Sequence, residues 1–247
     1  LNPGDLSGLG GVYYKQGAIP TSPTDGIYVE GSRRMLSGIS AIAEGEVPIY
    51  VWLVDKACNS DHQRRVSETL RYDGTPPTTT MSVTAGVEGG DGWYVSPVQI
   101  TLDGADDVSW LASSHYRIGD DGPWQSGTVS IIDVEGIVPF FYYSVDAAGN
   151  KEDTHADSVK IDTQPPSSYA YADSYTASTS FVVYWKGSDA SSGISAFYVQ
   201  RRDGAAGAWQ DWATSIGPAQ GSKLVTEAVP GMTYYFRAKA TDNAGNE

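Results

Sequence analysis

Short segments in which apolar and polar residues alternate recur along the whole chain. In Val98–Leu102 every second residue is apolar, the period of a half-buried antiparallel strand, and Phe181–Trp185 is a denser apolar run of the same length. Three longer runs, rich in aromatic and β-branched residues, predict the strands that carry most of the core: Ile49–Val54, Phe140–Val145 and Tyr234–Ala240. Helices of useful length are hard to place among the 28 glycines and 13 prolines, so the pattern predicts an all-β protein.

Each of these three runs is followed by the same turn, which begins with Asp and ends with Asn four residues later. The copies are Asp55–Asn59, Asp146–Asn150 and Asp242–Asn246. Their Asp residues lie 146 − 55 = 91 and 242 − 146 = 96 residues apart, which suits one small β-sandwich and is too long for a solenoid turn. Cys58 stands where the other copies have Gly149 and Gly245, and we interpret it as a tolerated substitution. The chain is therefore predicted to be an array of three sandwiches.

Two Asp-x-x-Pro-Pro segments, Asp73–Pro77 and Asp162–Pro166, mark where the sandwiches meet. Consecutive prolines lack amide donors and fix φ, so they end a strand and make a stiff connector. The predicted domains are residues 1–75, 76–164 and 165–247.

The two terminal domains are predicted to be incomplete within this chain. A polar loop that begins with Asp recurs upstream in each domain, at Asp5, Asp107 and Asp189. Only four residues precede the loop at Asp5, whereas some thirty separate Pro77 from the loop at Asp107, so the first domain lacks its first strands. The last domain has no counterpart of the strand predicted at Ser158–Asp162. Either the chain was cut from a longer array, or the missing strands are supplied in trans by the next copy, head to tail.

Charge and apolar content exclude two classes of partner. Against 30 acidic residues there are 16 Lys and Arg, giving a net charge of −14, and basic residues never run longer than pairs. Such a surface repels phosphate backbones, so nucleic acid is excluded as a partner. No apolar stretch approaches the roughly 18 residues of a spanning helix, so membrane insertion is not expected. Cys58 is the only cysteine, which rules out an intrachain disulfide.

The motifs of the last domain resemble those of fibronectin type III domains. They are Trp185, Tyr198–Gly204, Trp209–Trp212 and Val229–Ala240, in which a Pro-Gly-x-Thr-Tyr segment leads into the sixth strand. The middle domain is similar to the bacterial Ig-like repeats of microbial surface and secreted proteins, through Tyr116–Ile118, Trp124–Ser126, Tyr142–Asn150 and Ile161–Pro166. The first domain resembles the middle one from about Asp5. The resemblance implies tandem immunoglobulin-like or fibronectin type III-like β-sandwiches at the cell surface, with Tyr234 as a tyrosine corner. Val47 and Val138 occupy the same offset in the other two domains.

The topology of such a sandwich brings the incoming connector, the upstream polar loop and the Asp-to-Asn turn to one end. This would gather two sets of ligands, one at each junction: Asp73, Asp107, Asp146 and Asn150, and Asp162, Asp189, Asp242 and Asn246. Convergent carboxylate, amide and backbone oxygens suit Ca²⁺, which takes six to eight oxygen ligands. The alternative is that Asp and Asn bond their own backbone amides in the turns, which explains the motif with no metal. No other cofactor is indicated.

Several tryptophans stand beside Gly- or Asp-rich turns, where exposed rings could stack on sugars: Trp93, Trp110, Trp124, Trp209 and Trp212. The competing interpretation is that they fill the sandwich cores, as most tryptophans do. A coplanar, solvent-facing pair would favour carbohydrate binding.

Catalysis is not expected, because His62, His115 and His155 are scattered and no catalytic motif surrounds them. The sequence favours a non-catalytic structural or adhesive module of an extracellular surface protein: a stalk, adhesin or filament subunit. Its expected partners are neighbouring copies of itself, adjacent repeats and cell-surface glycans. The alternative is a polysaccharide-binding accessory region of a secreted hydrolase. No Asn-x-Ser/Thr sequon is present, whereas Ser/Thr clusters at 78–80, 167–168 and 178–180 are compatible with O-linked sugars.

Overall fold

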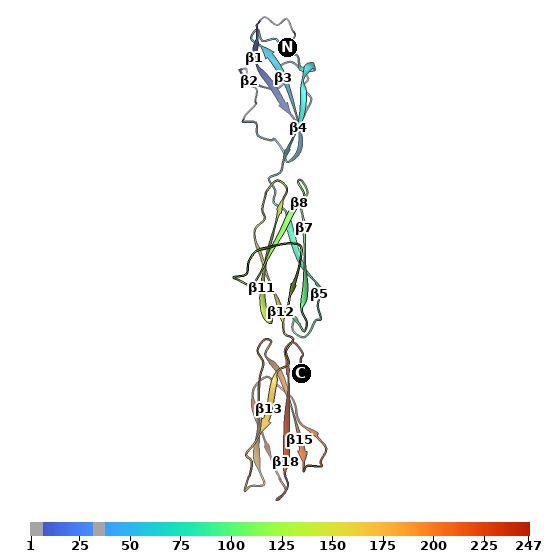
Figure 1. The fold of residues 1–247 in the computed structure, drawn as a ribbon, viewed down its shortest axis with the longest axis vertical. Helices are drawn as coiled ribbons and strands as arrows, with labels where there is room; N and C mark the ends of the chain where they lie inside the picture. The colour runs from blue at the N-terminus through green and yellow to red at the C-terminus, as the bar shows by residue number, and fades with distance from the viewer. Residues whose placement is uncertain (1–6, 32–37) are drawn as a thin grey trace. The chain divides into compact units, whose positions relative to one another are not determined.

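A computed structural model describes residues 7–31 and 38–247, and it is nearly all β (Figure 1). The described strands form several sheets with no barrel, as predicted, and their pairing is antiparallel apart from that of β6 with β12. A short 3-10 helix, His62–Arg64, is capped by Asp61, whose carboxylate accepts a hydrogen bond from the Gln63 amide. No helix among the described residues is long and apolar enough to cross a membrane.

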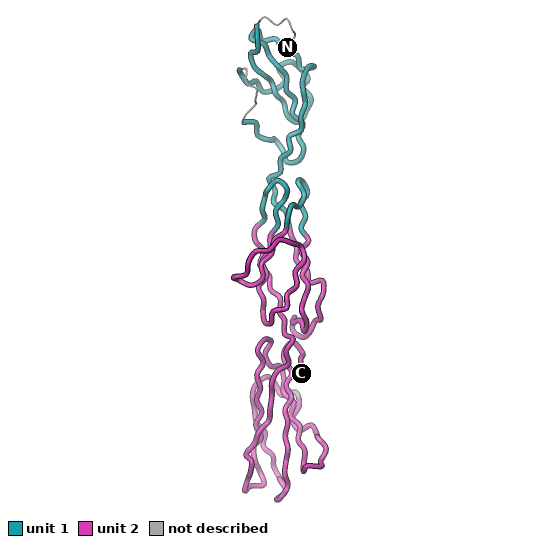
Figure 2. Tube along the Cα trace, in the orientation of Figure 1, with its two compact units in different colours: residues 1–78, 104–113, 144–152 teal, residues 79–103, 114–143, 153–247 magenta. Residues whose placement is uncertain are grey.

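The chain divides into two compact units, coloured separately in Figure 2. One comprises residues 1–78, 104–113 and 144–152, and the other residues 79–103, 114–143 and 153–247. The domain boundaries predicted near residues 76 and 165 stay a prediction. Pro76 and Pro77 lie between strands β4 and β5, and Pro165 and Pro166 between β12 and β13.

The described part of the first predicted domain is one four-stranded sheet, ordered β2-β1-β3-β4. Its strands are β1 (Leu9–Gln16), β2 (Ile27–Glu30), β3 (Gly45–Asp55) and β4 (Val66–Tyr72). The predicted strand at 49–54 lies within β3, at the centre. Trp52 is 1% exposed; its ring stacks on Tyr13 with centroids 5.5 Å apart, and its Nε1 donates to the Pro23 carbonyl at 2.8 Å. Asp5 lies outside the described residues.

The middle predicted domain contains two sheets around one core. The first is ordered β10-β7-β5, from β5 (Thr78–Ala85), β7 (Val98–Ala105) and β10 (Val129–Ile132). The second is ordered β6-β12-β11-β8-β9, from β6 (Trp93–Tyr94), β8 (Leu111–Ile118), β9 (Gln125–Ser126), β11 (Gly136–Asp146) and β12 (His155–Ile161).

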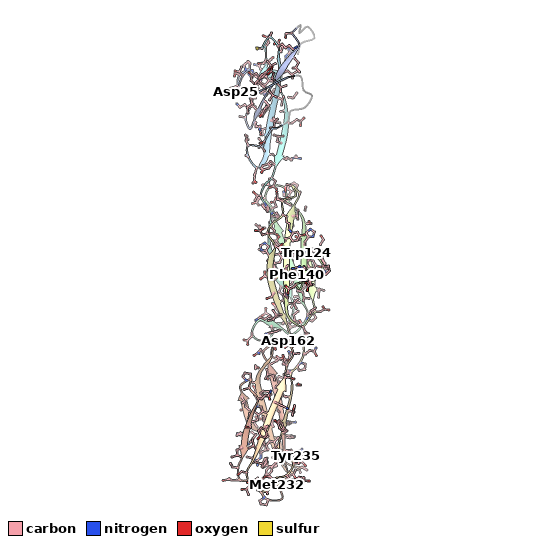
Figure 3. All side chains as sticks on the ribbon, turned by 90° about the vertical axis from the view of Figure 1, so that its left-hand side faces the viewer. Asp25, Trp124, Phe140, Asp162, Met232 and Tyr235 are labelled. Carbon is pink, nitrogen blue, oxygen red and sulfur yellow. The ribbon has the colours of Figure 1, made fainter. Side chains whose placement is uncertain are left out.

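The alternation seen in the sequence fills this core. On β7 the side chains of Val98, Ile100 and Leu102 are buried while the residues between them are only partly covered, which confirms the predicted period. They pack with Phe140 of β11, labelled in Figure 3, and with residues from β8, β10 and β12. Burial of both inner faces against each other is what holds this pair of sheets together.

The last predicted domain also has two sheets. One is ordered β13-β14-β17, from β13 (Ser167–Tyr171), β14 (Phe181–Ser188) and β17 (Gly221–Val225). The other is ordered β16-β15-β18, from β15 (Ile194–Asp203), β16 (Gln210–Ile216) and β18 (Tyr234–Asp242). Trp185, Phe197 and Val199 are buried between them.

The predicted tyrosine corner is present at Tyr234, whose hydroxyl oxygen accepts a hydrogen bond from the Val229 amide at 2.8 Å. Val47 and Val138, at the same offset before the Asp of the turn, are buried apolar residues. The corner is thus found in the last predicted domain.

Candidate functional site

The three Asp-to-Asn turns share one hydrogen-bond pattern. In each, one carboxylate oxygen of the Asp accepts from the Asn backbone amide at 2.8 Å, and the other accepts from the Asn side-chain amide at 2.8 to 2.9 Å. The Asp amide in turn donates to the Asn carbonyl at 3.1 Å in all three. The turn chemistry that the sequence offered as the metal-free interpretation is therefore realised.

In two of the turns these bonds favour the ionised Asp by lowering its pKa. Hydrogen bonds from the Asn59 side chain and then from its backbone lower the pKa of Asp55. For Asp146, burial is the largest influence and opposes ionisation, but hydrogen bonds led by those from Asn150 together outweigh it and leave the pKa below its usual value.

The fourth residue of the turn needs a left-handed backbone in every copy. Gly149 and Gly245 have φ of 95° and 99°, and Cys58 has φ of 66°. A left-handed conformation is easy for glycine and strained for cysteine. Cys58 is exposed and unpaired, in line with its interpretation as a tolerated substitution.

Two of the turns lie in clusters of three acids. Asp146 lies with Asp73 and Asp106, and one carboxylate oxygen from each lies within 4.8 Å of the others. An equivalent cluster joins Asp162, Asp189 and Asp242. The structure thus brings together the connector, the upstream loop and the turn, as the topological argument expected.

The first cluster uses Asp106 where the sequence pointed to Asp107, which is exposed. The Asp106 Oδ1 accepts the amides of residues 108, 109 and 110 at 2.8 to 3.0 Å, closing the loop over its carboxylate. Asp189 does the same with residues 191 and 193. Trp110 has φ of 68° and Gly193 has φ of 80°. When the two loops are aligned on these left-handed residues, Asp106 is the counterpart of Asp189. A non-glycine residue at that position hid the signal.

Asn150 and Asn246 act as donors in the structure. The side-chain amide of Asn150 donates to the Asp73 carbonyl at 3.1 Å as well as to Asp146, and Asn246 donates to the Asp162 carbonyl at 3.0 Å as well as to Asp242. They tie the turn to the connector, and their predicted role as ligands through the amide oxygen stays a prediction.

One atom of the first cluster stands out chemically. The Asp73 Oδ1 accepts the Thr75 amide at 3.0 Å, whereas its Oδ2 is buried and has no hydrogen-bond partner among the described residues. A buried carboxylate oxygen without a donor, on an Asp that is clustered with two further acids, is costly unless a cation is present. Oxygen-only donors of this kind fit a hard cation such as Ca²⁺. In the second cluster both Asp162 oxygens already accept backbone amides, from Gln164 and Ser192.

The five tryptophans divide between the core and the surface. Trp93 is buried, and Trp212 packs in the core of the last domain. Trp110 and Trp124 are 77% and 42% exposed. Trp209 lies between two guanidinium groups, those of Arg202 and Arg237, at 4.9 and 4.5 Å from its ring centre. Burial of Trp93 removes it from any sugar-stacking surface, whereas Trp212 is half-buried.

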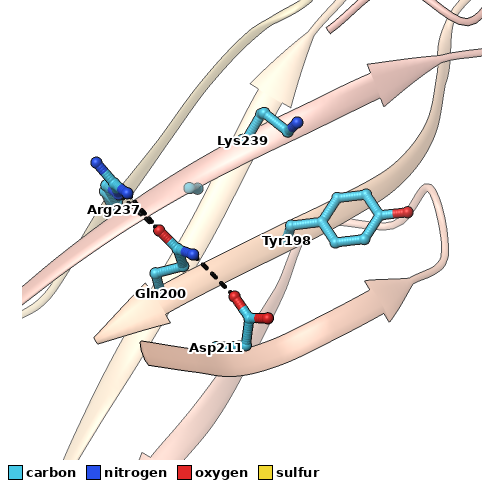
Figure 4. A pocket seen from close by; sticks show the side chains of 6 residues that line it. Tyr198, Gln200, Asp211, Arg237 and Lys239 are labelled. Atoms are coloured by element: carbon cyan, nitrogen blue, oxygen red, sulfur yellow. Dashed lines mark hydrogen bonds between the residues drawn. The ribbon is translucent and has the colours of Figure 1, made fainter. Parts of the chain in front are cut away.

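Sequence reasoning missed a groove on the sheet β16-β15-β18. It has a volume of about 520 Å³ and is lined by Tyr198, Gln200, Asp211, Arg237, Ala238 and Lys239 (Figure 4). Its lining alternates with core residues along β15 and β18, so the only available signal was the polar half of a period-two pattern.

No family model and no curated relative matches this chain. Among solved structures it is similar to a tetra-tandem repeat in the extending region of a large adhesion protein, with 16% identity and a TM-score of 0.34. That alignment covers 98% of this chain and 65% of the other, so the chain spans less than two thirds of it. Chicken CNTN1 FN1-FN3 domains align with 12% identity and a TM-score of 0.27, over 81% of this chain and 73% of the other. Chitinase ChiA74 from Bacillus thuringiensis aligns with 14% identity and a TM-score of 0.28, over 72% and 29%. At such scores these likenesses carry no functional argument.

Proposed function

We propose that this chain is a non-catalytic structural or adhesive module of an extracellular surface protein, acting as a stalk, an adhesin or a filament subunit. The observation that supports it most is recurrence. The strands β3, β11 and β18 all end in the same turn with the same hydrogen bonds. Copying one sandwich in series lengthens a molecule and multiplies its surface without a reactive centre. Its partners on this proposal are adjacent repeats or neighbouring copies.

An incompletely covered sheet face supports strand exchange between copies. Val12 is paired with Leu53 and Val66 with Val51, so these side chains share one face of the first sheet. Leu53 is 42% and Val66 65% exposed. Within residues 7–31 and 38–72 the structure contains one sheet and no second sheet to cover this face.

The middle domain shows what covers the equivalent face. Val47 and Val138 are equivalent, because each lies eight residues before the Asp of its turn. Val138 pairs with Val159 of the next strand, and Val47 pairs with Leu70. Val138 and Val159 are buried in a core to which β7 and β10 contribute. On the first sheet Val47 is already buried, so the proposal is that a strand of alternating apolar residues from a neighbouring copy covers the exposed part of this face, around Leu53 and Val66.

The edge of β18 supports the same exchange at the other end of the chain. In the described sheets β18 pairs only with β15, whereas β11 lies between β8 and β12. The hydroxyl of Ser168 donates to the Ala238 carbonyl at 3.4 Å, so part of the β18 backbone is already satisfied. Remaining unpaired groups on an edge strand are a template for another strand, which a head-to-tail neighbour would provide.

Sedimentation velocity of the full chain over a range of concentrations tests this. We expect association that grows with concentration and that Leu53→Lys weakens by at least about tenfold, because it places a charge on the face to be covered. Ile131→Lys is the matched control, since Ile131 is an apolar strand residue that is 66% exposed on β10. A chain that stays monomeric throughout, or equal weakening by both variants, would refute strand exchange between copies.

The alternative, a polysaccharide-binding accessory region of a secreted hydrolase, is favoured by one observation, the groove on β16-β15-β18.

A further inference from the structure

The groove lies on the outer face of the sheet β16-β15-β18, where cross-strand pairing sets its composition. Tyr198 lies opposite Lys239, and Gln200 lies opposite both Arg237 and Asp211. Directly paired residues project to the same face, so an aromatic ring, two cations, an amide and a carboxylate share one surface. A volume of about 520 Å³ is in the range of small-molecule sites.

The polar groups of the groove are held in place before any ligand arrives. The Nε and Nη2 of Arg237 donate to the Gln200 Oε1 at 2.8 and 2.6 Å, and the Gln200 Nε2 donates to the Asp211 Oδ1 at 2.8 Å, as the dashed lines in Figure 4 show. The ring of Trp209 lies 4.5 Å from the guanidinium carbon of Arg237. A fixed guanidinium presents its remaining donors at little entropic cost.

The second cation lies beside the aromatic ring. The Lys239 Nζ is 6.0 Å from the centre of the Tyr198 ring and pairs with the carboxylate of Glu247 at 2.5 Å. Arg237, Lys239 and Asp211 are exposed and Tyr198 is half-buried, so all four are within reach of a solute.

The combination of groups selects a ligand class. A flat aromatic ring stacks on a sugar ring, and exposed cations pair with a carboxylate. Asp211 can accept hydrogen bonds from hydroxyl groups through the oxygen that Gln200 does not use. A neutral sugar would leave the remaining donors of Arg237 without an anionic partner, because in the free groove Arg237 donates only to the neutral Gln200 amide oxygen.

The net charge of −14 does not forbid an anionic ligand here. At physiological ionic strength the Debye length is about 8 Å, so charges elsewhere on the chain are largely screened and the nearest ones decide. Nearest are Arg237 and Lys239, and Arg202 lies on the same face, its guanidinium 4.5 Å from the centre of the Tyr235 ring. Asp211 and Glu247 are the neighbouring anions.

We propose that this groove binds an acidic saccharide, an oligosaccharide that contains uronic acid. Tyr198 stacks on one sugar ring, Arg237 and Lys239 pair with its carboxylate, and Asp211 accepts from its hydroxyls. This inference goes beyond the structural role and does not depend on strand exchange.

The test titrates the full ¹⁵N-labelled chain with trigalacturonate and, in parallel, with its fully methyl-esterified form, which has the same rings and no charge. We expect amide shifts confined to β15, β16 and β18 with the acid, and at least tenfold weaker binding of the ester. Raising the salt concentration should weaken binding of the acid, as screening requires.

Variants locate the site and keep the test independent of folding. Arg237→Gln and Lys239→Gln should each weaken binding about tenfold while leaving the remaining amide spectrum unchanged. Arg71→Gln is the matched control, since Arg71 is an exposed arginine on β4. Equal binding of acid and ester, shifts outside this sheet, no binding up to about 10 mM ligand, or equal losses from all three variants would overturn the proposal.

Discussion

Replacing Tyr234 with Phe isolates one hydrogen bond of the last domain. The ring stays, so its contacts with Phe181, 5.8 Å away between centroids, and with the Arg201 guanidinium, 4.6 Å from the ring centre, are retained. Only the bond from the Val229 amide to the hydroxyl, 2.8 Å long, is lost. A net hydrogen bond contributes about 0.5 to 1.5 kcal/mol, and because Val229 is 57% exposed, water can take over as acceptor. We therefore expect a loss of about 1 kcal/mol, or roughly 4 to 8 °C in Tm for a domain of this size.

Urea unfolding followed by peptide-level hydrogen exchange assigns the change to a part of the chain, which matters because several domains need not unfold together. The loss should appear in residues 165–247 and leave the core around Phe140 unchanged. Tyr235→Phe is the control, because it removes the neighbouring hydroxyl on the opposite face of β18. Equal effects of the two variants, or no loss in Tyr234→Phe, would show that the tyrosine corner does not stabilise this domain.

Three further predictions concern the first acid cluster, acid stability and the middle core. Chelation of divalent cations should lower the Tm, calcium should restore it, and Asp73→Asn should abolish the response; an unchanged melting curve would dismiss the ion. Hydrogen bonds from Lys15, and then from Thr21, lower the pKa of Asp25 from 3.8 to about 2. Because the pKa of Asp25 is lower in the folded than in the unfolded state, the ionised carboxylate stabilises the fold above about pH 4, and this contribution is lost as the pH falls toward about 2. Carboxyl NMR titration of the wild type and acid unfolding of Asp25→Asn would check this. Phe140→Ala should cost about 3 to 5 kcal/mol in urea unfolding, since this side chain is fully buried, and a loss below about 1 kcal/mol would contradict the assigned core.

Much of the fold could be predicted because local patterns and burial agree. The three aromatic runs lie in β3, β11 and β18, and the alternation at Val98–Leu102 is the buried face of β7. The short strands β2, β6 and β9 carry too few residues for a period to show, and they exist through pairing with longer neighbours.

The acid clusters were predictable to within one residue, whereas for the groove the sequence offered only the polar half of a period-two pattern. The turn motifs are local and can be recognised in the sequence. The topology of the sandwich then predicts that Asp73 of the connector and Asp146 of the turn lie close together. Whether Asp106 or Asp107 belongs to the cluster depends on the left-handed backbone at Trp110. Tryptophan rarely adopts this conformation, so the residue type gave no indication of it. The groove depends on the cross-strand register of β15 with β16 and β18, including irregularities beside Phe197 and Val199 that no residue pattern marks.

The Asp-to-Asn turns also bear on the order in which the chain folds. Their closing bonds join residues no more than four apart, so the hairpins of β3 with β4 and β11 with β12 can start within microseconds, before distant strands meet. A fixed starting point sets the strand alignment, and a slip of one residue would turn every core side chain outward. Where successive copies offer similar strands, this early local closure lets each strand find its own partner before a strand from a neighbour competes for it.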